Sequence, residues 1–335
     1  MHIHTTLLVA FLAIAGTGVF GKDPSLYEYY TSGGIKSGLE ANSPDHFTLN
    51  GKPYIIYSGS LHFFRAVPQY WRPLLQRFKA AGLNAVQFYL PWNLHEDRPG
   101  DFDFKSAALD LARFLEEIKL ADMFAIVRPG PYICAEWELG GYPSWLLRDP
   151  HLKLRSNYKP YLDRVKPFWD EALKIINKYQ FSVNGGPVIL LQTENEYSAG
   201  IHHPDSDEYL NFLLKIVRDS GFKELIFNSD PDNTAQRYPI KGVYKDNSVL
   251  QTANLNRNAL KHLTELKKNQ PGKPAFVSEF WPGWFDDWHE QHHHRYSVET
   301  FEHEISDLLF KVNGSVNFYM FFGGTNFAFL NGERK

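Results

Sequence analysis

Two glutamates are the residues of this sequence best suited to do chemistry. Glu196 lies in GGPVILLQTENEY, just after an apolar run, and Glu279 follows the apolar run AFVS in the segment SEFWPGW. Two carboxyl groups about 5–5.5 Å apart hydrolyse a glycosidic bond with retention when one protonates the leaving group and the other, ionised, attacks the anomeric carbon. The pair therefore indicates glycoside hydrolysis, although the residues alone do not decide which glutamate has which role.

The residue types near this pair suit a neutral ligand that is rich in hydroxyl groups. Asn195 can hydrogen-bond a sugar hydroxyl, and Glu136 can accept bonds from two adjacent hydroxyls. Tyr89, Trp281 and Tyr319 can offer ring faces or phenolic donors to the same ligand. An isolated glutamate at the end of a strand often does no more than pair with an arginine, but this richer setting favours a sugar-binding site.

Eight short apolar runs alternate with amphipathic stretches, and these elements must position the candidate residues. The runs predict strands at 54–60, 85–90, 124–128, 188–193, 224–229, 249–253, 275–278 and 316–321. The stretches predict helices at 70–81, 107–120, 161–179, 206–220, 259–268 and 298–311. Eight alternations predict an α/β fold, the (β/α)8 TIM barrel. The alternative is an open doubly wound sheet, but SGSLHFFRAVP after the first strand lacks the glycine-rich phosphate turn of that fold.

A barrel of this kind explains how the two glutamates would meet. Catalytic residues of TIM barrels lie at the carboxyl ends of the strands. Glu196 follows the fourth predicted strand, and Glu279 follows the seventh. Because these strands are three apart in a ring of eight, we expect the two carboxyl groups to face each other across the mouth of the barrel.

The composition is that of a globular protein without affinity for nucleic acid. The 335 residues carry a formal charge of −3, with 43% hydrophobic and 22% charged residues, and this balance lacks the basic excess that phosphate backbones require. The length fits one large domain better than two. Cys134 is the only cysteine, which excludes an internal disulfide. The sequon at Asn313 predicts a glycoprotein.

The two ends of the chain carry further expectations. Residues 1–21 predict a secretory signal peptide, because the apolar stretch 7–15 is too short to span a bilayer and small residues follow it. A catalytic domain is then expected at 22–335, in a lysosomal or extracellular location. No later run reaches the length of a membrane span. Only GGTNFAFLNGERK follows the eighth predicted strand, so the barrel is expected to lack its final helix.

Six segments of the chain resemble glycoside hydrolase family 35, the β-galactosidases that include the lysosomal enzyme of animals. They are SGSLHFFR, QFYLPWNLHE, RPGPYICAEWELGGYPSWLL, GGPVILLQTENEY, SEFWPGW and FYMFFGGTNF. The resemblance implies a (β/α)8 barrel that removes terminal, non-reducing β-linked galactose, with Glu196 as acid/base and Glu279 as nucleophile. It also implies that no metal or organic cofactor takes part, and that galactose is contacted at the positions of Tyr89, Ala135, Glu136, Asn195 and Tyr319.

Several residues depart from the family pattern. Asp97 stands where the family usually has proline, Ser198 replaces a glycine, and Trp281 replaces a tyrosine beside the nucleophile. The change at Trp281 removes a phenolic hydroxyl that could orient the attacking carboxylate, so slower turnover is expected. Family members also usually continue beyond the barrel into β-rich domains, so this chain is expected to be curtailed.

Two other hypotheses remain open at this stage. In the first, the chain is a catalytically impaired barrel fragment that binds galactose but does not hydrolyse galactosides. A chromogenic β-galactoside would distinguish this case from the enzyme, because a binding protein releases no chromophore. In the second and more remote one, the chain is a zinc hydrolase, because residues 289–293 read HEQHH and satisfy the HExxH pattern. His294 or His303 would then supply a third ligand. Such a site requires a well-packed helix, and few apolar residues flank this segment.

Overall fold

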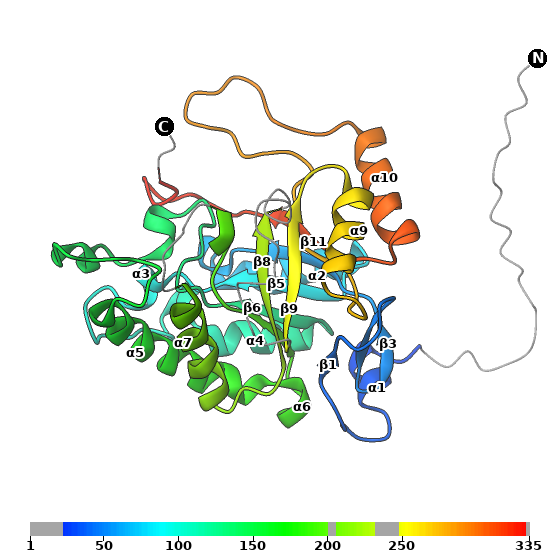
Figure 1. Cartoon of the computed structure of the whole chain (residues 1–335), viewed down its shortest axis with the longest axis horizontal. Coiled ribbons are helices and arrows are strands. Elements are labelled where there is room, and N and C mark those ends of the chain that lie inside the picture. Colours follow the sequence, from blue (N-terminus) through cyan, green and yellow to red (C-terminus); the bar gives the residue numbers. More distant parts are fainter. Residues whose placement is uncertain (1–22, 200–205, 232–247, 333–335) are drawn as a thin grey trace, which may run out of the picture.

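Eight parallel strands close into one barrel in the computed structural model, which describes residues 23–199, 206–231 and 248–332 (Figure 1). The strands follow one another around the ring in chain order, and the last pairs with the first. They are β4 (Tyr57–Leu61), β5 (Ala85–Tyr89), β6 (Phe124–Arg128), β7 (Val188–Gln192), β8 (Leu225–Pro231), β9 (Val249–Leu255), β10 (Phe276–Phe280) and β11 (Ser315–Phe322). The predicted TIM barrel is therefore confirmed, and β6 has the predicted bounds.

Amphipathic helices pack around the outside of the barrel. The main ones are α2 (Trp71–Ala80), α4 (Leu111–Leu120), α5 (Lys159–Ile176), α7 (Ser206–Asp219), α9 (Ala259–Asn269) and α10 (Val298–Ser306). Each overlaps a predicted helix, and two short ones, α3 (Trp92–His95) and α6 (Phe181–Asn184), lie in the connections. Residues 323–332, which follow β11, form turns and irregular backbone rather than a helix. The predicted signal peptide lies outside the described residues.

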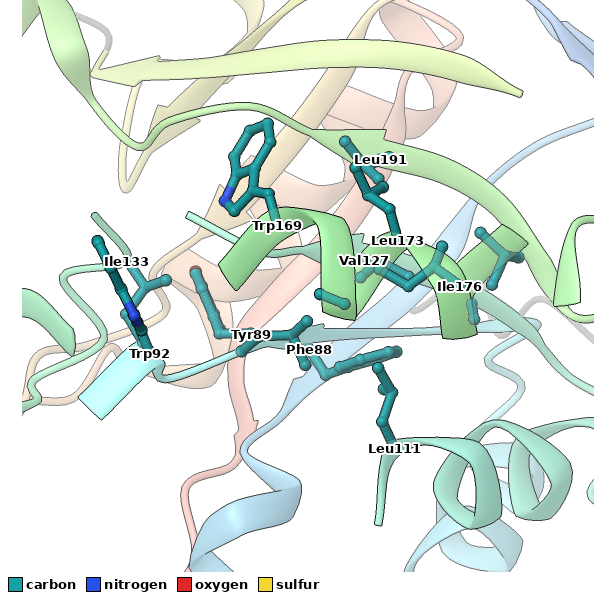
Figure 2. Packing of buried hydrophobic residues seen from close by; sticks show 14 of the residues in the cluster. Phe88, Tyr89, Trp92, Leu111, Val127, Ile133, Trp169, Leu173, Ile176 and Leu191 are labelled. Carbon is teal, nitrogen blue, oxygen red and sulfur yellow. The ribbon is translucent and has the colours of Figure 1, made fainter. Parts of the chain in front are cut away.

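Alternation of side chains along β5 and β6 separates the two faces of the barrel wall. Phe88 and Val127 point outward and join the apolar cluster that includes Leu173 of α5 (Figure 2). Tyr89 and Arg128, the next residues along each strand, therefore point inward at the mouth of the barrel. The same pattern that builds the outer core thus delivers polar side chains to the inside.

A small N-terminal unit closes the lower end of the barrel, where the strands begin (Figure 1). It consists of α1 (Leu26–Thr31) and an antiparallel sheet of β1 (Leu39–Glu40), β2 (Phe47–Leu49) and β3 (Lys52–Tyr54). Its buried Phe47 and Leu49 share one apolar cluster with Phe124 and Phe276, the first residues of β6 and β10. The sequence did not predict this unit, because strands of two or three residues carry too little alternation to be recognised.

A third apolar cluster joins the last strands to their helices. Leu255 of β9, Val277 of β10 and Val316 of β11 pack with Leu263 of α9 and with Leu308, which follows α10. This packing holds β10 firmly in the barrel wall. Across the described ranges, no helix has the length and apolar character needed to cross a bilayer.

Candidate active site

A bulge in β10 turns Glu279 into the barrel. Phe276 packs in the lower interior, Val277 packs in the outer cluster, and Ser278 hydrogen-bonds inside the barrel. Strict alternation would then direct Glu279 outward. The pairing of β10 with both neighbours shifts register between Val277 and Phe280, and a bulge of this kind can re-aim a side chain. As a result Glu279 points inward, and Phe280 packs in the outer cluster.

Three donors hold the carboxylate of Glu279. Its Oε1 accepts a bond from Arg128 Nη1 at 2.6 Å and one from the Tyr89 hydroxyl at 2.8 Å. Its Oε2 accepts a bond from the indole Nε1 of Trp281 at 3.0 Å. The guanidinium of Arg128 is 1% exposed, so this charge-assisted pair is shielded from water, and such bonds are short and strong. Together the three bonds fix the orientation of the carboxylate.

Trp281 supplies a donor at the position where the sequence predicted the loss of one. A tryptophan there lacks the phenolic hydroxyl of the family pattern, which was the reason for expecting slower turnover. The indole N–H nevertheless reaches Glu279 Oε2. A second kind of donor thus takes the place of the missing hydroxyl, and slower turnover stays a prediction.

A tightly anchored turn after β7 presents Glu196. Two residues earlier, Glu194 accepts bonds from Arg155 Nη2 at 2.6 Å and from the Tyr209 hydroxyl at 2.7 Å. Arg155 also donates to the backbone carbonyl of Asn195 at 2.5 Å. Glu194 and Glu196 have φ values of 63° and 48°, a left-handed conformation that costs about 1–2 kcal/mol for a non-glycine residue. Glu194 is thus a structural carboxylate that offsets this strain, and Glu196 is the one that lines the cleft.

The surroundings of Glu196 suit a general acid. Burial, together with the nearby charge of Glu279, raises the pKa of Glu196 from 4.5 to about 7. Asn254 Nδ2 donates to Glu196 Oε1 at 2.9 Å, and this bond and the charge of Arg128 act in the opposite direction. A carboxyl group with a pKa near neutrality can both give and accept a proton at ordinary pH.

Hydroxyl groups inside the barrel orient Asn254. Its Oδ1 accepts bonds from the hydroxyls of Ser229 at 2.5 Å and Ser278 at 3.0 Å. Because these bonds occupy the oxygen, the amide nitrogen is turned towards Glu196. The carbonyl of Ser229 also accepts a bond from the backbone N–H of Glu196 at 2.8 Å. Inward-facing residues of three strands therefore hold Glu196 from below.

The loop after β6 places Glu136 on the wall of the same cleft. Cys134, Ala135 and Glu136 have φ values of 55°, 60° and 44°. Arg65 holds this left-handed backbone by donating to the carbonyls of Ala135, at 2.9 Å, and of Glu136. The Tyr319 hydroxyl donates to Glu136 Oε2 at 2.6 Å. Burial raises the pKa of the Cys134 thiol to about 11, which does not suit a nucleophile.

These side chains line an open cleft of about 1160 Å³ at the mouth of the barrel. Seven of the eight predicted site residues line it, namely Ala135, Glu136, Asn195, Glu196, Glu279, Trp281 and Tyr319. The eighth, Tyr89, is buried and bonds to Glu279. The fold therefore brings the predicted residues together, while their roles in binding and catalysis stay predictions.

Arg128 and Asn254 are site residues to which the sequence assigned no role. Arg128 donates to Glu279 and to the side chain of Asn195, and Asn254 donates to Glu196. Arg128 is the last residue of β6, and Asn254 is the last but one of β9. The available signal was a polar residue at the carboxyl end of an apolar strand. Asn254 directly follows the predicted strand at 249–253, which ended two residues before β9 does, so this signal was present but was not used.

The histidine-rich segment 289–293 does not have the geometry of a zinc hydrolase. It lies in an exposed, irregular stretch between β10 and α10, drawn in orange in Figure 1, and not on a helix. Glu290 pairs with His294 at 2.9 Å, and Asp286 pairs with His293 at 2.6 Å. In the described part of the chain, no three histidine, cysteine or carboxylate side chains are grouped to hold a metal ion. The helix that the zinc hypothesis required is not formed by this segment.

Comparison with known sequences links the chain to one family. The family model described as "Glycosyl hydrolases family 35" matches residues 46–335. The chain is 40% identical over 299 residues to "Beta-galactosidase-1-like protein 3" from Homo sapiens, and the matched segment covers 89% of this chain and 44% of that protein. It is 38% identical over 291 residues to "Beta-galactosidase" from Felis catus, with coverage of 86% and 42%. The chain thus spans less than half the length of these relatives.

Solved structures of low sequence identity share the fold. "Exo-beta-1,4-mannosidase Op5Man5" from Opitutaceae bacterium strain TAV5 has a TM-score of 0.58 at 15% identity, covering 84% of this chain and 55% of that one. The "beta-glucuronidase 2" of Bacteroides uniformis, covalently bound to cyclophellitol-6-carboxylate aziridine, has a TM-score of 0.53 at 16% identity, covering 84% and 32%. At these identities the likeness concerns the fold alone.

Proposed function

This chain belongs to family 35 of the glycosyl hydrolases, and on that premise we propose that it is a retaining exo-β-galactosidase. Its substrates are galactosides with a terminal, non-reducing β-linked galactose. The observation that carries the proposal is the contrast between two neighbouring carboxyl groups. Glu196 is buried with a pKa of about 7, whereas Glu279 is held by Arg128, Tyr89 and Trp281. Environments that differ in this way separate an acid from a nucleophile.

In the first step Glu279 attacks the anomeric carbon while Glu196 protonates the departing oxygen. The bond between the anomeric carbon and the aglycone oxygen breaks, and the aglycone leaves as an alcohol. An ester forms between galactose and Glu279. Arg128 and Tyr89 donate to Oε1 of this carboxylate, so they keep it aimed at the anomeric carbon.

In the second step Glu196, now ionised, takes a proton from water as the water attacks the anomeric carbon. The ester bond to Glu279 breaks, and Glu196 is protonated again. Because each displacement inverts the anomeric centre, two displacements release β-galactose. The bond from Asn254 favours the ionised form of Glu196 and so supports its return as a base.

For the sugar, we assign hydroxyl contacts to Glu136, Asn195 and Tyr319, which line the cleft and carry polar side-chain atoms. Trp281 and Ala135 complete its wall. Galactose is the sugar named for the relative "Beta-galactosidase", and this supports the choice. We also assign residues 1–21 to a secretory signal peptide and 22–335 to the catalytic domain, with a lysosomal or extracellular destination.

The nucleophile is tested with Glu279→Ala. We expect turnover of every galactoside to fall by several orders of magnitude, because both the covalent step and the charge beside the transition state are lost. Added azide should restore cleavage in part and yield α-galactosyl azide by a single inversion. Wild-type protein treated with a 2-deoxy-2-fluoro-galactoside should carry the label on Glu279. A label on Glu136 or Glu194 would overturn the assignment.

The acid is tested with Glu196→Gln. Galactosides with poor leaving groups should lose far more activity than activated aryl galactosides, since only the former need protonation. Early-time NMR on the wild-type protein should detect the β-anomer of galactose first. Equal losses on both substrate types, or early α-galactose, would refute the pairing of the two glutamates. Protection from thermal unfolding by galactose without any hydrolysis would indicate a binding protein instead.

A further inference from the structure

A second contact holds the turn of Glu196, at the carboxyl end of β8. Asp230 is the last residue but one of β8, and its side chain accepts two hydrogen bonds from Ser198, which comes two residues after Glu196. The Ser198 hydroxyl donates to Asp230 Oδ1 at 2.6 Å, and the Ser198 backbone N–H donates to the same oxygen at 3.1 Å. The backbone N–H of Glu196 donates to the carbonyl of Ser229. The end of β8 therefore holds the turn at Glu196 itself and again two residues later.

The shorter of these two bonds depends on a departure from the family pattern. Ser198 stands where the family usually has a glycine, and a glycine can offer its backbone N–H to Asp230 but has no hydroxyl to donate. A bond of 2.6 Å between a hydroxyl and a carboxylate oxygen is of the charge-assisted kind, which is about twice as strong as a bond between neutral groups. Ser198 thus adds a strong contact that a glycine cannot make.

Asp230 is a buried carboxyl group that receives its hydrogen bonds from neutral groups. It is 7% exposed, and besides Ser198 the amide Nδ2 of Asn228 donates to its Oδ2 at 2.7 Å. Burial raises the pKa of Asp230, and the nearby charge of Glu194 raises it further, whereas the bonds from Ser198 and Asn228 lower it. The Ser198 hydroxyl therefore favours the ionised form of Asp230. Because this charge lies away from water, it acts strongly on other groups nearby.

The titratable groups that face Glu196 come from three strands and from the loop after β6. They are Glu279 of β10, Arg128 of β6, Asp230 of β8 and the thiol of Cys134. Burial is the largest cause of the raised pKa of Glu196, the charges of Glu279 and Asp230 raise it further, and that of Arg128 lowers it. Arg128 and Glu279 form an ion pair and offset each other in part, and Cys134, with a pKa of about 11, is neutral near pH ~7. Among these groups, the carboxylate of Asp230 is bonded to neutral donors, so its charge acts on Glu196 without such an offset.

We propose that Asp230 and Ser198 are a positioning pair, which holds the turn of Glu196 against β8 and sets the pH range over which Glu196 protonates the leaving group. The inference rests on the proposed function and adds two residues to it. Neither residue lines the cleft, so both act through Glu196. The negative charge of Asp230 keeps Glu196 protonated to a higher pH, and the Ser198 hydroxyl keeps Asp230 ionised.

The charge is tested with Asp230→Asn, which changes the shape of the side chain little. In the described part of the chain Asn228 Oδ1 accepts no hydrogen bond, so the amide of Asn228 can turn over and accept a bond from the introduced amide nitrogen. Values of kcat/KM for a galactoside with a poor leaving group are measured against pH. We expect the basic limb to begin at lower pH, with kcat/KM several-fold below the wild-type value at pH ~8 and close to it at pH ~5. Asp122→Asn is the matched control: Asp122 also accepts a bond from a backbone N–H, that of Leu26 at 2.9 Å, but lies just before β6 at the lower end of the barrel, so the limb should not move.

The hydroxyl is tested with Ser198→Ala and Ser198→Thr. Ser198→Ala should move the basic limb in the same direction as Asp230→Asn but less far, and Ser198→Thr, which keeps a hydroxyl, should retain the wild-type profile. In a protein that already carries Asp230→Asn, adding Ser198→Ala should move the limb no further, because no charge remains for the hydroxyl to stabilise.

Three results would overturn the positioning pair. One is a basic limb at the wild-type pH in a folded, active Asp230→Asn protein. Another is an equal effect of Ser198→Ala with and without Asp230→Asn. If Asp230→Asn does not fold, an unchanged limb in Ser198→Ala overturns the pair by itself. Wild-type protein that does not hydrolyse the galactoside contradicts the proposed function instead.

Discussion

Replacing Trp281 by phenylalanine removes the indole N–H from Glu279 and keeps an aromatic ring in its place. In the described part of the chain, Trp281 Nε1 is the donor to Glu279 Oε2, whereas Oε1 has two donors, Arg128 and Tyr89. The Trp281→Phe protein therefore retains the positive charge beside Glu279. We expect it to lose the orientation of the carboxylate, and with it part of the rate of attack on the anomeric carbon.

The size of this loss follows from the kind of bond that is removed. A hydrogen bond to a charged group contributes about 1.5–3 kcal/mol, which corresponds to roughly 10- to 150-fold in rate. The lower end applies here, because Trp281 is half-buried and water can replace the indole N–H. We expect the first chemical step to be about tenfold slower.

The rate of labelling by a 2-deoxy-2-fluoro-galactoside with a good leaving group measures this step directly. Labelling of Trp281→Phe should be about tenfold slower than that of wild-type protein. Trp281→Tyr should recover part of the rate, since its hydroxyl can donate. Tyr70→Phe, which removes a donor from a ring that is 63% exposed and outside the cleft, should label at the wild-type rate. Wild-type labelling of a folded Trp281→Phe protein would refute the orienting role.

Further predictions concern Glu196 and the anchor of its turn. Because burial raises the pKa of Glu196 to about 7, kcat/KM should fall about tenfold per pH unit above pH ~7, and Glu196→Gln should remove this limb for activated aryl galactosides. The raised pKa of Glu196 also makes the stability of the fold depend on pH: its contribution to the free energy of unfolding is present below pH ~4.5 and is lost as pH rises through ~7. Glutamine stays uncharged, so calorimetry should find that Glu196→Gln raises the melting temperature more at pH 8 than at pH 4. Arg155→Met breaks the buried ion pair between Arg155 and Glu194 and should lower the free energy of unfolding by about 3–5 kcal/mol, because it leaves the Glu194 charge unpaired. Adding Glu194→Met removes that charge and should recover much of the loss. Equal melting temperatures for the single and double variants would contradict this account of the turn.

Long apolar runs made the barrel predictable, and short elements did not. The run at 124–128 carries five buried residues in succession and was predicted with the bounds of β6. Helices such as α2 were predicted within a residue or so, because their apolar residues recur at helical spacing. The unit of α1 and β1 to β3 was missed. Its three strands have only two or three residues each, and they are stabilised by contacts with distant parts of the chain.

The positions of the site residues were predictable, but their environments were not. Glu196 and Glu279 were found because both follow apolar runs whose ends meet in a barrel. The inward direction of Glu279 depends on a bulge that shifts the pairing of β10 with both neighbours, and a period-two pattern taken alone would direct it outward. The partners Arg128 and Asn254 come from strands far away in the sequence. The raised pKa of Glu196 depends on burial, which requires coordinates.

The unit that closes the lower end of the barrel also sets the order of events during synthesis of the chain. The ring of Phe47 lies 6.3 Å from that of Phe276, and the backbone N–H of Ile56 donates to the hydroxyl of Ser315, 259 positions later. Phe47 of this unit and Ile56, which precedes β4, thus leave the ribosome long before these partners, and the wait of Ile56 for Ser315 is a gap of 259 positions. At about 5–20 residues per second, that gap lasts roughly 13–50 s.

During this interval Phe47 can pack on early partners such as Tyr54, but it lacks Phe276, and β4 lacks its neighbour β11. Closing the ring requires β11 to pair with β4, and contacts between such distant segments form slowly. The barrel closes only after its eighth strand has been made, so the first strands stay in an open sheet until Ser315–Phe322 pairs with β4.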